Sequence, residues 1–540
     1  MKNILLFAIS LLFVVKVFPQ NDKSKNPSVE LPDFVITGTE NITVKKTQKI
    51  APAFVPIISE AFIKPYLPPD NLEVKDFSNP VKGSLDILDS LNFYRGYADI
   101  SAGRYLLPQG DLGLAFPFRY GMVDGYVKGE NQRAYVINSD RYSLDGGANV
   151  LLSVNSNSDF LPGTQFKFHG DYGSSVYKFF ASDSSGLKRT LNSGSFSFGM
   201  NNFISDNFNF SAKLYDDVTS LNKEDFSEGL FGVEGFTKAI FDHFNIDLNA
   251  AYKRQYVASM RKSDSLWFSS NGGSYKFFEI KPAVGFNISN TIKTSVGVYY
   301  SKSGNTNFIA PYGAIGLRLN RGVLIFAEYN PQMEFLTSGN FLKQNDYFLA
   351  ANHVNIVYKK KNAINAAIKY EYGEYYQINA GFKFFNFNNL PYFLESSAKG
   401  KFDITWTNGK SFDAFIDLLF HLGPYGIFYA SMDGSDVRDL NNHFIPYYPR
   451  ILAALAYGYE FNSGFGTKVK INYNSKSYAD IQNTIDLNSY FDLGLKFSYK
   501  FNPNFNITLS LNNLFDHKNY KWIGYREKPL DVAAGLEFKW

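Results

Sequence analysis

The sequence predicts an all-β fold: a large antiparallel transmembrane β-barrel of about 22–26 strands, preceded by a Pro-rich N-terminal segment. Three observations predict it. Apolar and polar residues alternate through most of the chain, aromatic residues make up 17% of its 540 residues, and short and long polar connections follow each other in turn. A barrel accounts for all three, because each strand presents one face to lipid and the other to a wide aqueous lumen.

The first twenty residues are typical of a secretion signal. Lys2 supplies the positive start, residues 4–15 are apolar except for Ser10, and Phe18-Pro19-Gln20 leads back to polar sequence. The apolar run is too short for a membrane-spanning helix, so we expect residues 1–20 to be removed on export, with an uncleaved anchor as the alternative. The absence of cysteine excludes a lipoprotein anchor, disulfides, thiolate metal sites and a Cys nucleophile.

Residues 21–93 differ in composition from the rest of the chain. We expect a mostly extended segment that is too short and too interrupted to form a core of its own. Closely spaced prolines prevent long strands and helices in this segment. They are Pro52, Pro56, Pro65, Pro68, Pro69 and Pro80. Residues 94–540 are expected to form the barrel.

The end of the chain shows the period-two alternation best. In residues 531–540 every second side chain is apolar, and the pattern repeats in residues 490–501. The opposite faces carry Gly, Asn, Ser and charged residues, which predicts a wet lumen with lipid outside; a secreted sandwich or propeller is the alternative. The lumen-lining candidates of these two strands are Asp492, Lys496, Lys500, Glu537 and Lys539.

Two C-terminal patterns carry a resemblance to known proteins. The apolar face that ends in Leu536, Phe538 and Trp540 resembles the C-terminal signal read by the outer-membrane barrel assembly machinery. Upstream, a short motif resembles the end of the barrel in TonB-dependent receptors, which implies a large outer-membrane barrel. The motif residues are Asn513, Leu514, Phe515, Asp516 and Tyr520. Asn513 and Asp516 suit the turn at a strand end.

A short β-prone stretch near the N-terminus resembles the energy-coupling box of the same receptors. The resemblance implies that this strand pairs with TonB by edge addition, in which main-chain hydrogen bonds dominate. A strand that merely packs on the barrel rim is the alternative. The box consists of Asp33, Phe34, Val35, Ile36, Thr37, Gly38 and Thr39.

One feature departs from that family. Only about 50 residues separate Glu40 from the first expected strand, which leaves no room for a full plug domain. Residues 96–116 are expected to form the first hairpin, with Leu107-Pro108-Gln109-Gly110 as its turn, and they resemble the barrel entry of plugless TonB-receptor-like proteins. The Pro-rich segment is then the candidate for partial occlusion of the lumen.

These observations predict a TonB-dependent-receptor-like barrel of the plugless or reduced-plug type in the cell outer membrane. It would move an unknown solute, with outer-membrane lipid, the barrel assembly machinery and TonB as partners. The alternatives are an assembly barrel that docks a periplasmic protein without transport, and an open porin-like pore. No enzyme motif is found, the six histidines are scattered, and the net charge of +4 is too small to indicate nucleic acid. No catalytic residue, metal ligand or cofactor is therefore expected.

Overall fold

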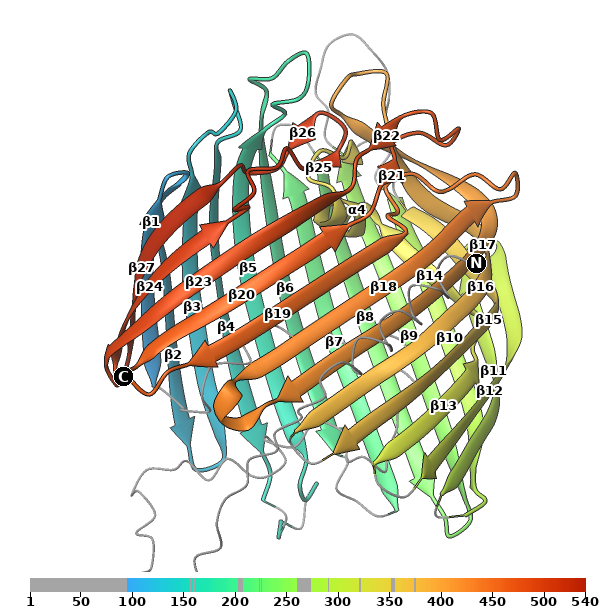
Figure 1. Ribbon diagram of the computed structural model, residues 1–540. Helices are drawn as coiled ribbons and strands as arrows, with labels where there is room; N and C mark the ends of the chain where they lie inside the picture. The colour runs from blue at the N-terminus through green and yellow to red at the C-terminus, as the bar shows by residue number, and fades with distance from the viewer. Residues whose placement is uncertain are drawn as a thin grey trace, which may run out of the picture. The chain divides into compact units, whose positions relative to one another are not determined.

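The computed structural model describes residues 95–540, except 156, 159–160, 203–206, 223, 225, 260–272, 290, 320–321, 351–354 and 373–374 (Figure 1). The expected signal peptide, the Pro-rich segment and the candidate TonB box, Asp33 to Thr39, lie outside the described residues. About 74% of what the structure describes is strand, as the predicted all-β fold requires.

The strands succeed one another along the chain with few other elements. The first thirteen are β1(Gly96–Gly103), β2(Leu106–Phe118), β3(Gly121–Gln132), β4(Arg141–Ser153), β5(Gln165–Lys178), β6(Lys188–Asn202), β7(Phe208–Leu221), β8(Phe226–Ile240), β9(Phe244–Ser259), β10(Gly273–Asn287), β11(Ile292–Ser303), β12(Thr306–Leu319) and β13(Val323–Tyr329). The next group comprises β14(Gln332–Thr337), the helix α4(Ser338–Gln344), β15(Asn355–Tyr372), β16(Tyr376–Glu395), β17(Phe402–His421), the 3-10 helix η3(Gly423–Tyr425), β18(Ile427–Asp439), β19(Ile451–Glu460) and β20(Phe465–Asn474). The last are β21(Ser477–Tyr478), β22(Asp486–Leu487), β23(Tyr490–Asn502), β24(Phe505–Asn512), β25(Tyr520–Trp522), β26(Tyr525–Arg526) and β27(Asp531–Lys539). None of the described helices is long and apolar enough to cross a membrane.

All long strands belong to one antiparallel sheet that closes on itself. It holds 23 described strands, but β13 and β14 pair with successive parts of β15 and occupy a single position in the wall. The barrel therefore has 22 strand positions, within the predicted range. Closure joins the first strand to the last, from Tyr97↔Lys539 to Gly103↔Ala533.

The two ends of the barrel differ in their connections, as expected. At the end that holds the chain's C-terminus, the connections are short, such as 119–120, 241–243, 461–464 and 503–504. At the other end lie long loops, including 338–354, 440–450, 475–489 and 513–530. We call these the tight-turn end and the long-loop end.

The turn predicted for the first hairpin is wrong. Residues 107–110 lie inside β2, and the connection between β1 and β2 is Arg104-Tyr105. The Pro-Gln-Gly sequence instead marks a register shift in the β2–β3 ladder between Leu107 and Gly110. Proline and glycine tolerate a bulge as well as a turn, so the composition alone did not distinguish the two.

The two faces of the wall are divided as predicted. Phe278, Val298 and Tyr256 are exposed on the outside, whereas their sequence neighbours Phe277, Tyr299 and Gln255 are buried inside. Leu536 and Phe538 of β27, and Trp540 directly after it, are each at least 40% exposed. An apolar exterior of this kind is stable only against lipid.

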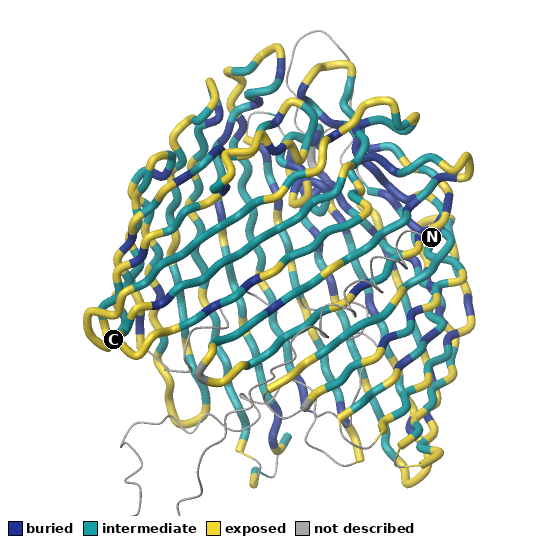
Figure 2. The backbone as a smooth tube through the Cα atoms, in the orientation of Figure 1, coloured by how far each residue is buried: buried dark blue, intermediate teal, exposed yellow. Residues whose placement is uncertain are grey.

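One part of the wall folds inward at the long-loop end. It consists of β14, residues 355–360 of β15, residues 390–395 of β16 and residues 402–407 of β17, which we call the inner layer. The β12–β13 ladder ends at Gly313↔Tyr329 and the β17–β18 ladder ends at Gly409↔Asp439, so the inner layer leaves the barrel wall on both sides. Residues 390–393 are all buried, and Figure 2 shows the buried chain gathered at this end.

Candidate functional site

The segment between β13 and β15 lies inside the barrel mouth. We call residues 332–350 the inward segment; it comprises β14, α4 and residues 345–350. Met333 and Phe335 of β14 pack on Phe277 and Tyr299, which belong to the lumenal faces of β10 and β11. The Tyr299 hydroxyl donates to the Met333 carbonyl at 3.1 Å, and the Phe335 ring stacks on Phe277 at 5.7 Å between centroids. The segment is therefore packed against the wall over its whole first strand.

A buried carboxylate holds the start of α4. Glu228, near the long-loop end of β8, is 3% exposed. Its Oε1 accepts a hydrogen bond from the Gly339 backbone N–H at 3.0 Å, and its Oε2 accepts one from Gln255 Nε2 at 2.9 Å. Removing this carboxylate would leave the N–H groups at the start of α4 buried without a partner.

A buried guanidinium holds the end of the segment. Arg189, at the start of β6, is 1% exposed. Its Nη1 donates to the Asp346 carbonyl at 2.6 Å and to the Phe348 carbonyl at 2.8 Å, and its Nε donates to Glu224 at 2.5 Å. A buried charge needs such compensation, because an unpaired one costs several kcal/mol. Arg189 thus ties the inward segment to β6.

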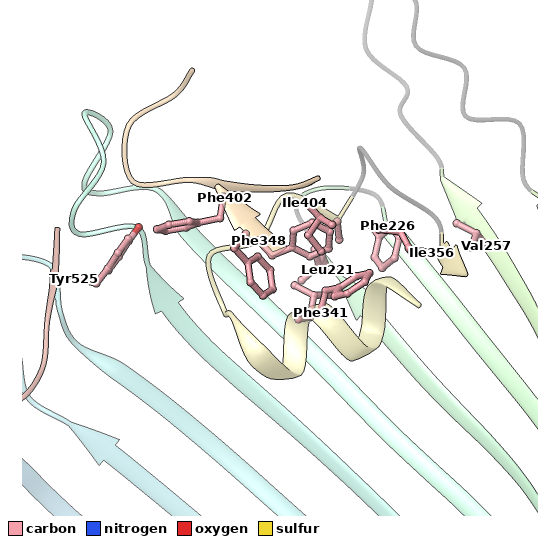
Figure 3. Packing of buried hydrophobic residues seen from close by; sticks show 12 residues of the cluster. Leu221, Phe226, Val257, Phe341, Phe348, Ile356, Phe402, Ile404 and Tyr525 are labelled. Carbon is pink, nitrogen blue, oxygen red and sulfur yellow. The ribbon is translucent and has the colours of Figure 1, made fainter. Parts of the chain in front are cut away.

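An apolar core forms between the segment, the inner layer and the loops (Figure 3). Its members come from three places: the ends of wall strands β7, β8 and β9, the inward segment with the inner layer, and the β25–β26 hairpin of loop 513–530. Figure 3 shows Phe341 of α4 beside Phe348, with Phe402 and Tyr525 continuing the row. The buried members are Leu221, Phe226, Val257, Phe341, Leu342, Phe348, Ala350, Ile356, Phe393, Phe402, Ile404 and Tyr525. The core therefore joins the inward segment to the wall at β7–β9 and to loop 513–530 at the long-loop end.

The inward segment also joins the inner layer through its backbone. Phe348 forms a parallel bridge with Phe402, the Leu349 N–H donates to the Phe402 carbonyl at 2.8 Å, and the Phe402 N–H donates to the Tyr347 carbonyl at 3.1 Å. The Tyr347 ring stacks on Tyr525. Segment, inner layer and the β25–β26 hairpin are thus packed as one unit.

A polar cavity of about 470 Å³ lies beside this core, between the C-terminal end of α4, the β25–β26 hairpin and the ends of β3, β4 and β5. Its lining is unusually rich in charge and in side-chain amides. The lining residues are Gln132, Tyr135, Ser139, Asp140, Arg141, Tyr177, Lys178, Phe180, Lys343, Gln344, Asp346, Tyr347, Tyr490, Asp492, Asn512, Asn513, Asn519, Lys521, Trp522, Tyr525, Arg526, Glu527, Lys528 and Pro529.

Two ion pairs build the cavity wall. Arg141 Nη1 lies 2.5 Å from the Asp346 carboxylate, and Lys178 Nζ lies 2.8 Å from Asp140. The Tyr135 hydroxyl donates to the Arg526 carbonyl at 2.8 Å, and burial together with the nearby Glu527 carboxylate raises the pKa of Tyr135 to about 12. The phenol is therefore protonated at neutral pH and remains a donor.

The structure places the predicted lumen-lining residues on the polar face, in different surroundings. Asp492 joins the cavity and accepts from the Asn513 N–H at 3.1 Å. Lys496 pairs with Glu537 at 3.1 Å, and Lys500 pairs with Glu460. Lys539 lies opposite Tyr97 across the β1–β27 seam. Only Asp492 is near the cavity, so the others form no common site with it.

The motif residues near the C-terminus lie at a loop base. Asn513 and Asp516 both adopt positive φ. Asn513 Nδ2 donates to the Lys528 carbonyl at 2.9 Å, and Asp516 accepts from the Leu530 N–H at 3.0 Å. Leu514 follows Asn513 in this turn, Phe515 is exposed and Tyr520 begins β25. The motif connects the two ends of loop 513–530; its role in recognition remains a prediction.

Sequence reasoning missed the residues that anchor the inward segment or pack in the core around it: Arg189, Glu228, Asp346, Phe341, Phe348 and Tyr525. A signal was present, because residues 341–350 place Phe341, Leu342, Phe348 and Leu349 in what was expected to be a surface loop. Such apolar density in a long polar-flanked loop indicates burial. The buried charges gave no signal, because their partners are distant in sequence.

Within the described part of the chain, no cluster of three His, Cys, Asp or Glu side chains could hold a metal ion. Of the histidines, His169 bonds to Asn149 and Asp171, and His443 bonds to Asp439.

Comparison with known proteins identifies the fold. No protein family model matches the chain, and no curated protein is similar in sequence. Solved structures of similar shape include the copper transporter OprC (12% identity, TM-score 0.61, 83% of this chain and 80% of that one). Others are the siderophore receptor PiuA from Acinetobacter baumannii (11%, 0.61, 83% and 82%) and the FrpB iron transporter from Neisseria meningitidis (9%, 0.63, 84% and 83%). The chain therefore has the 22-strand barrel fold of TonB-dependent outer-membrane receptors.

Proposed function

We propose that the protein carries a solute across the outer membrane through its lumen, and that the inward segment closes this path at the long-loop end. A barrel of 22 positions is too wide for wall side chains to fill. The observation that carries the proposal is the core of Figure 3, in which the inward segment packs on β7–β9 and on the β25–β26 hairpin of loop 513–530. The similar transporters and receptors support the solute-carrying role.

Opening requires the inward segment to leave its anchors, and those anchors suit a switch. Two buried side chains, Glu228 and Arg189, hold the start of α4 and residues 346–348 through backbone groups. Such contacts are specific to one position of the segment, so a small shift would break them together. A closed state held in this way is stable and yet can be released as a unit.

Energy coupling is the second part of the proposal. The box-like residues 33–39 would pair with TonB, and a pull on them would release the closed state. Replacing Val35 and Ile36 with Pro should abolish capture of the chain by the TonB periplasmic domain, because proline removes the backbone donors of a paired strand. Undiminished capture would contradict the coupling.

Two other functions predict different behaviour. A permanently open pore would conduct without any change to the inward segment. An assembly barrel that transports nothing would stay silent even when the segment is released. The barrel as such is compatible with both, but a core packed inside the long-loop end favours gated passage over the open pore.

Conductance in planar bilayers separates these functions. We expect the full chain to be silent, and the double variant Arg189→Gln/Glu228→Gln to show steps of steady conductance. Deletion of residues 21–93 alone should leave the chain silent, because the mouth stays closed. The control Lys188→Gln changes an exposed neighbour of Arg189 and should stay silent. Silence of the double variant, with its barrel shown to be folded, would reject passage through the lumen.

A further inference from the structure

We infer that three cations on the outer face of β9, β10 and β11 bind a membrane lipid whose headgroup carries a phosphate monoester. The cations are Arg254, Lys276 and Lys302, which we call the outer cation cluster. The cluster lies near the long-loop end, which in outer-membrane barrels is the extracellular end. Because it lies on the outer wall, passage through the lumen does not depend on it.

The strand register brings the three side chains together. Lys276 lies directly opposite Arg254 in the β9–β10 ladder, and Lys302 lies opposite Phe278 in the β10–β11 ladder. Side chains that are two residues apart or directly opposite point to the same side, so all three cations share the outward face of the exposed rings of Tyr256 and Phe278. Directly opposite side chains are about 5 Å apart and diagonal ones about 7–8 Å apart. The three charged ends can therefore meet around one phosphate.

The cluster lies at the edge of the apolar band that faces lipid. Lys276 is the first outward side chain of β10 beyond this band, and Lys302 follows Val298 and Tyr300 on the outward face of β11. A residue directly beyond the apolar band lies at the level of the lipid headgroups. The outward side chains of β10 that precede Lys276 are Phe286, Val284, Pro282, Ile280 and Phe278.

The described part of the chain supplies no acid to the cluster. Arg254 donates from Nε to Ser274 Oγ at 2.9 Å and lies over the Tyr256 ring, 4.5 Å from its centroid. In the same row of the outer face, the acid is Asp216 of β7, which is separated from Arg254 by Phe231. Two strand spacings of about 4.8 Å lie between Asp216 and Arg254. Ser274 belongs to β10, so the guanidinium leans away from β7.

Other opposed cations in the barrel show how the chain usually compensates such a pair. Like charges directly opposite each other destabilise a sheet. Within the described ladders, four such pairs are Arg254–Lys276, Lys178–Lys188, Lys410–Arg438 and Lys468–Lys496. In the last three, one member forms an ion pair with an acid of the chain: Lys178 with Asp140, Arg438 with Asp436 and Lys496 with Glu537. The Arg254–Lys276 pair has no such partner among the described residues, so an external anion is the group that would compensate it.

A phosphate monoester fits the cluster in charge and in geometry. It carries about −1.5 to −2 charges at neutral pH and offers three acceptor oxygens. Arg254 uses its Nε for Ser274, which leaves the terminal nitrogens of the guanidinium for phosphate. Lys276 acts beside it as a point charge. Because the exposed rings of Tyr256 and Phe278 border the same place, the occupant is a lipid whose acyl chains cover these rings.

Three lipids with the same acyl chains test the site: dioleoyl phosphatidic acid, dioleoyl phosphatidylglycerol and dioleoyl phosphatidylcholine. Their headgroups are a phosphate monoester, an anionic diester and a zwitterionic diester. Each lipid is titrated into the full chain in detergent micelles, and native mass spectrometry measures the apparent affinity of the first bound lipid. We expect phosphatidic acid to bind at least about tenfold more tightly than phosphatidylcholine, as one charge-assisted hydrogen bond would give, with phosphatidylglycerol between them. Equal affinities, or any other order, would overturn the inference.

Variants locate the site on the barrel. Arg254→Gln/Lys276→Gln should remove the preference for phosphatidic acid, and Lys302→Gln, at a single exposed position, should weaken it. The control Lys188→Gln/Lys410→Gln removes two exposed cations from pairs that the chain itself compensates and should keep the preference. Electrophoresis of unheated samples confirms that each barrel is folded. An unchanged preference in the first variant and in Lys302→Gln would contradict the assignment, as would its loss in the control.

Glycerol 3-phosphate separates a lipid site from a site for soluble phosphate. It carries the headgroup of phosphatidic acid without the acyl chains. At the same concentration as phosphatidic acid, it should leave the lipid bound, because it gains nothing from the apolar rings beside the cluster. Displacement of phosphatidic acid under these conditions would overturn the assignment to a lipid.

Discussion

At the scale of single residues, two buried charges decide the position of a long segment. Arg189 and Glu228 are each at most 3% exposed, and both bind backbone groups of the inward segment. Because their partners are main-chain atoms, the segment's sequence need not be charged. This explains why neither residue was identified from sequence: each lies on a strand among ordinary lumen-facing polar residues.

Arg189→Gln should loosen the end of the inward segment without unfolding the barrel. The change leaves Glu224 unpaired and removes the charged donor to the Asp346 and Phe348 carbonyls. Loss of one partner of a buried pair costs about 3–5 kcal/mol. Hydrogen exchange followed by mass spectrometry should show amides in residues 341–349 exchanging at least about a hundredfold faster, with β6 itself unchanged.

The matched variant Lys188→Gln should leave that exchange as it is. Protection of residues 341–349 that is the same in Arg189→Gln as in the unmodified chain would show that the guanidinium does not hold the segment.

At the scale of elements, the inner layer and the inward segment form a small core at the mouth. The strands themselves could be predicted, because alternation sets the face of each residue. The inward bend could not, because it depends on where the ladders end, at Gly313↔Tyr329 and Gly409↔Asp439. Strand ends of this kind follow from tertiary packing, which local sequence does not encode.

Phe348→Ala should destabilise the core at the mouth by about 3–5 kcal/mol, because this ring is fully buried and its removal leaves a cavity. The expected readout is limited proteolysis, with cleavage appearing in residues 338–350 at protease concentrations that spare the unmodified chain.

Phe515→Ala is the control, since Phe515 is 59% exposed in loop 513–530. It should leave cleavage of residues 338–350 unchanged. Equal protease resistance of the Phe348 variant would mean that the mouth does not depend on this core.

At the scale of the whole molecule, closure of the barrel depends on its two ends meeting. The Trp540 N–H donates to the Gly96 carbonyl at 3.0 Å, and the Gly96 N–H donates to the Trp540 carbonyl at 3.1 Å. The alternation of apolar residues at the C-terminus predicted this terminal strand. That Trp540 pairs with Gly96 follows only from the register of the β1–β27 ladder.

Gly96→Val should reduce the yield of folded barrel. A Cβ at this position would lie 2.5 Å from the Trp540 ring, so the ring must move away from the seam. Folded and unfolded fractions can be compared by electrophoresis of unheated and heated samples. Gly186→Val is the control, because nothing lies within 4 Å of a Cβ there; equal yields of the two variants would contradict this account of closure.

Side-specific labelling of one lumenal position tests the central claim most directly. Because the chain contains no cysteine, an introduced cysteine is its only reactive thiol. Ser498→Cys places a thiol on the polar face of β23, near the tight-turn end, and Leu509→Cys places one on the apolar outer face. A charged maleimide added to intact cells should not label Ser498→Cys in the otherwise unchanged chain. It should label Ser498→Cys when the chain also carries Arg189→Gln/Glu228→Gln. Leu509→Cys should stay unlabelled in both backgrounds. Labelling of Ser498→Cys in the unreleased chain would show that the mouth is open, and no labelling after release would show that no path leads through it.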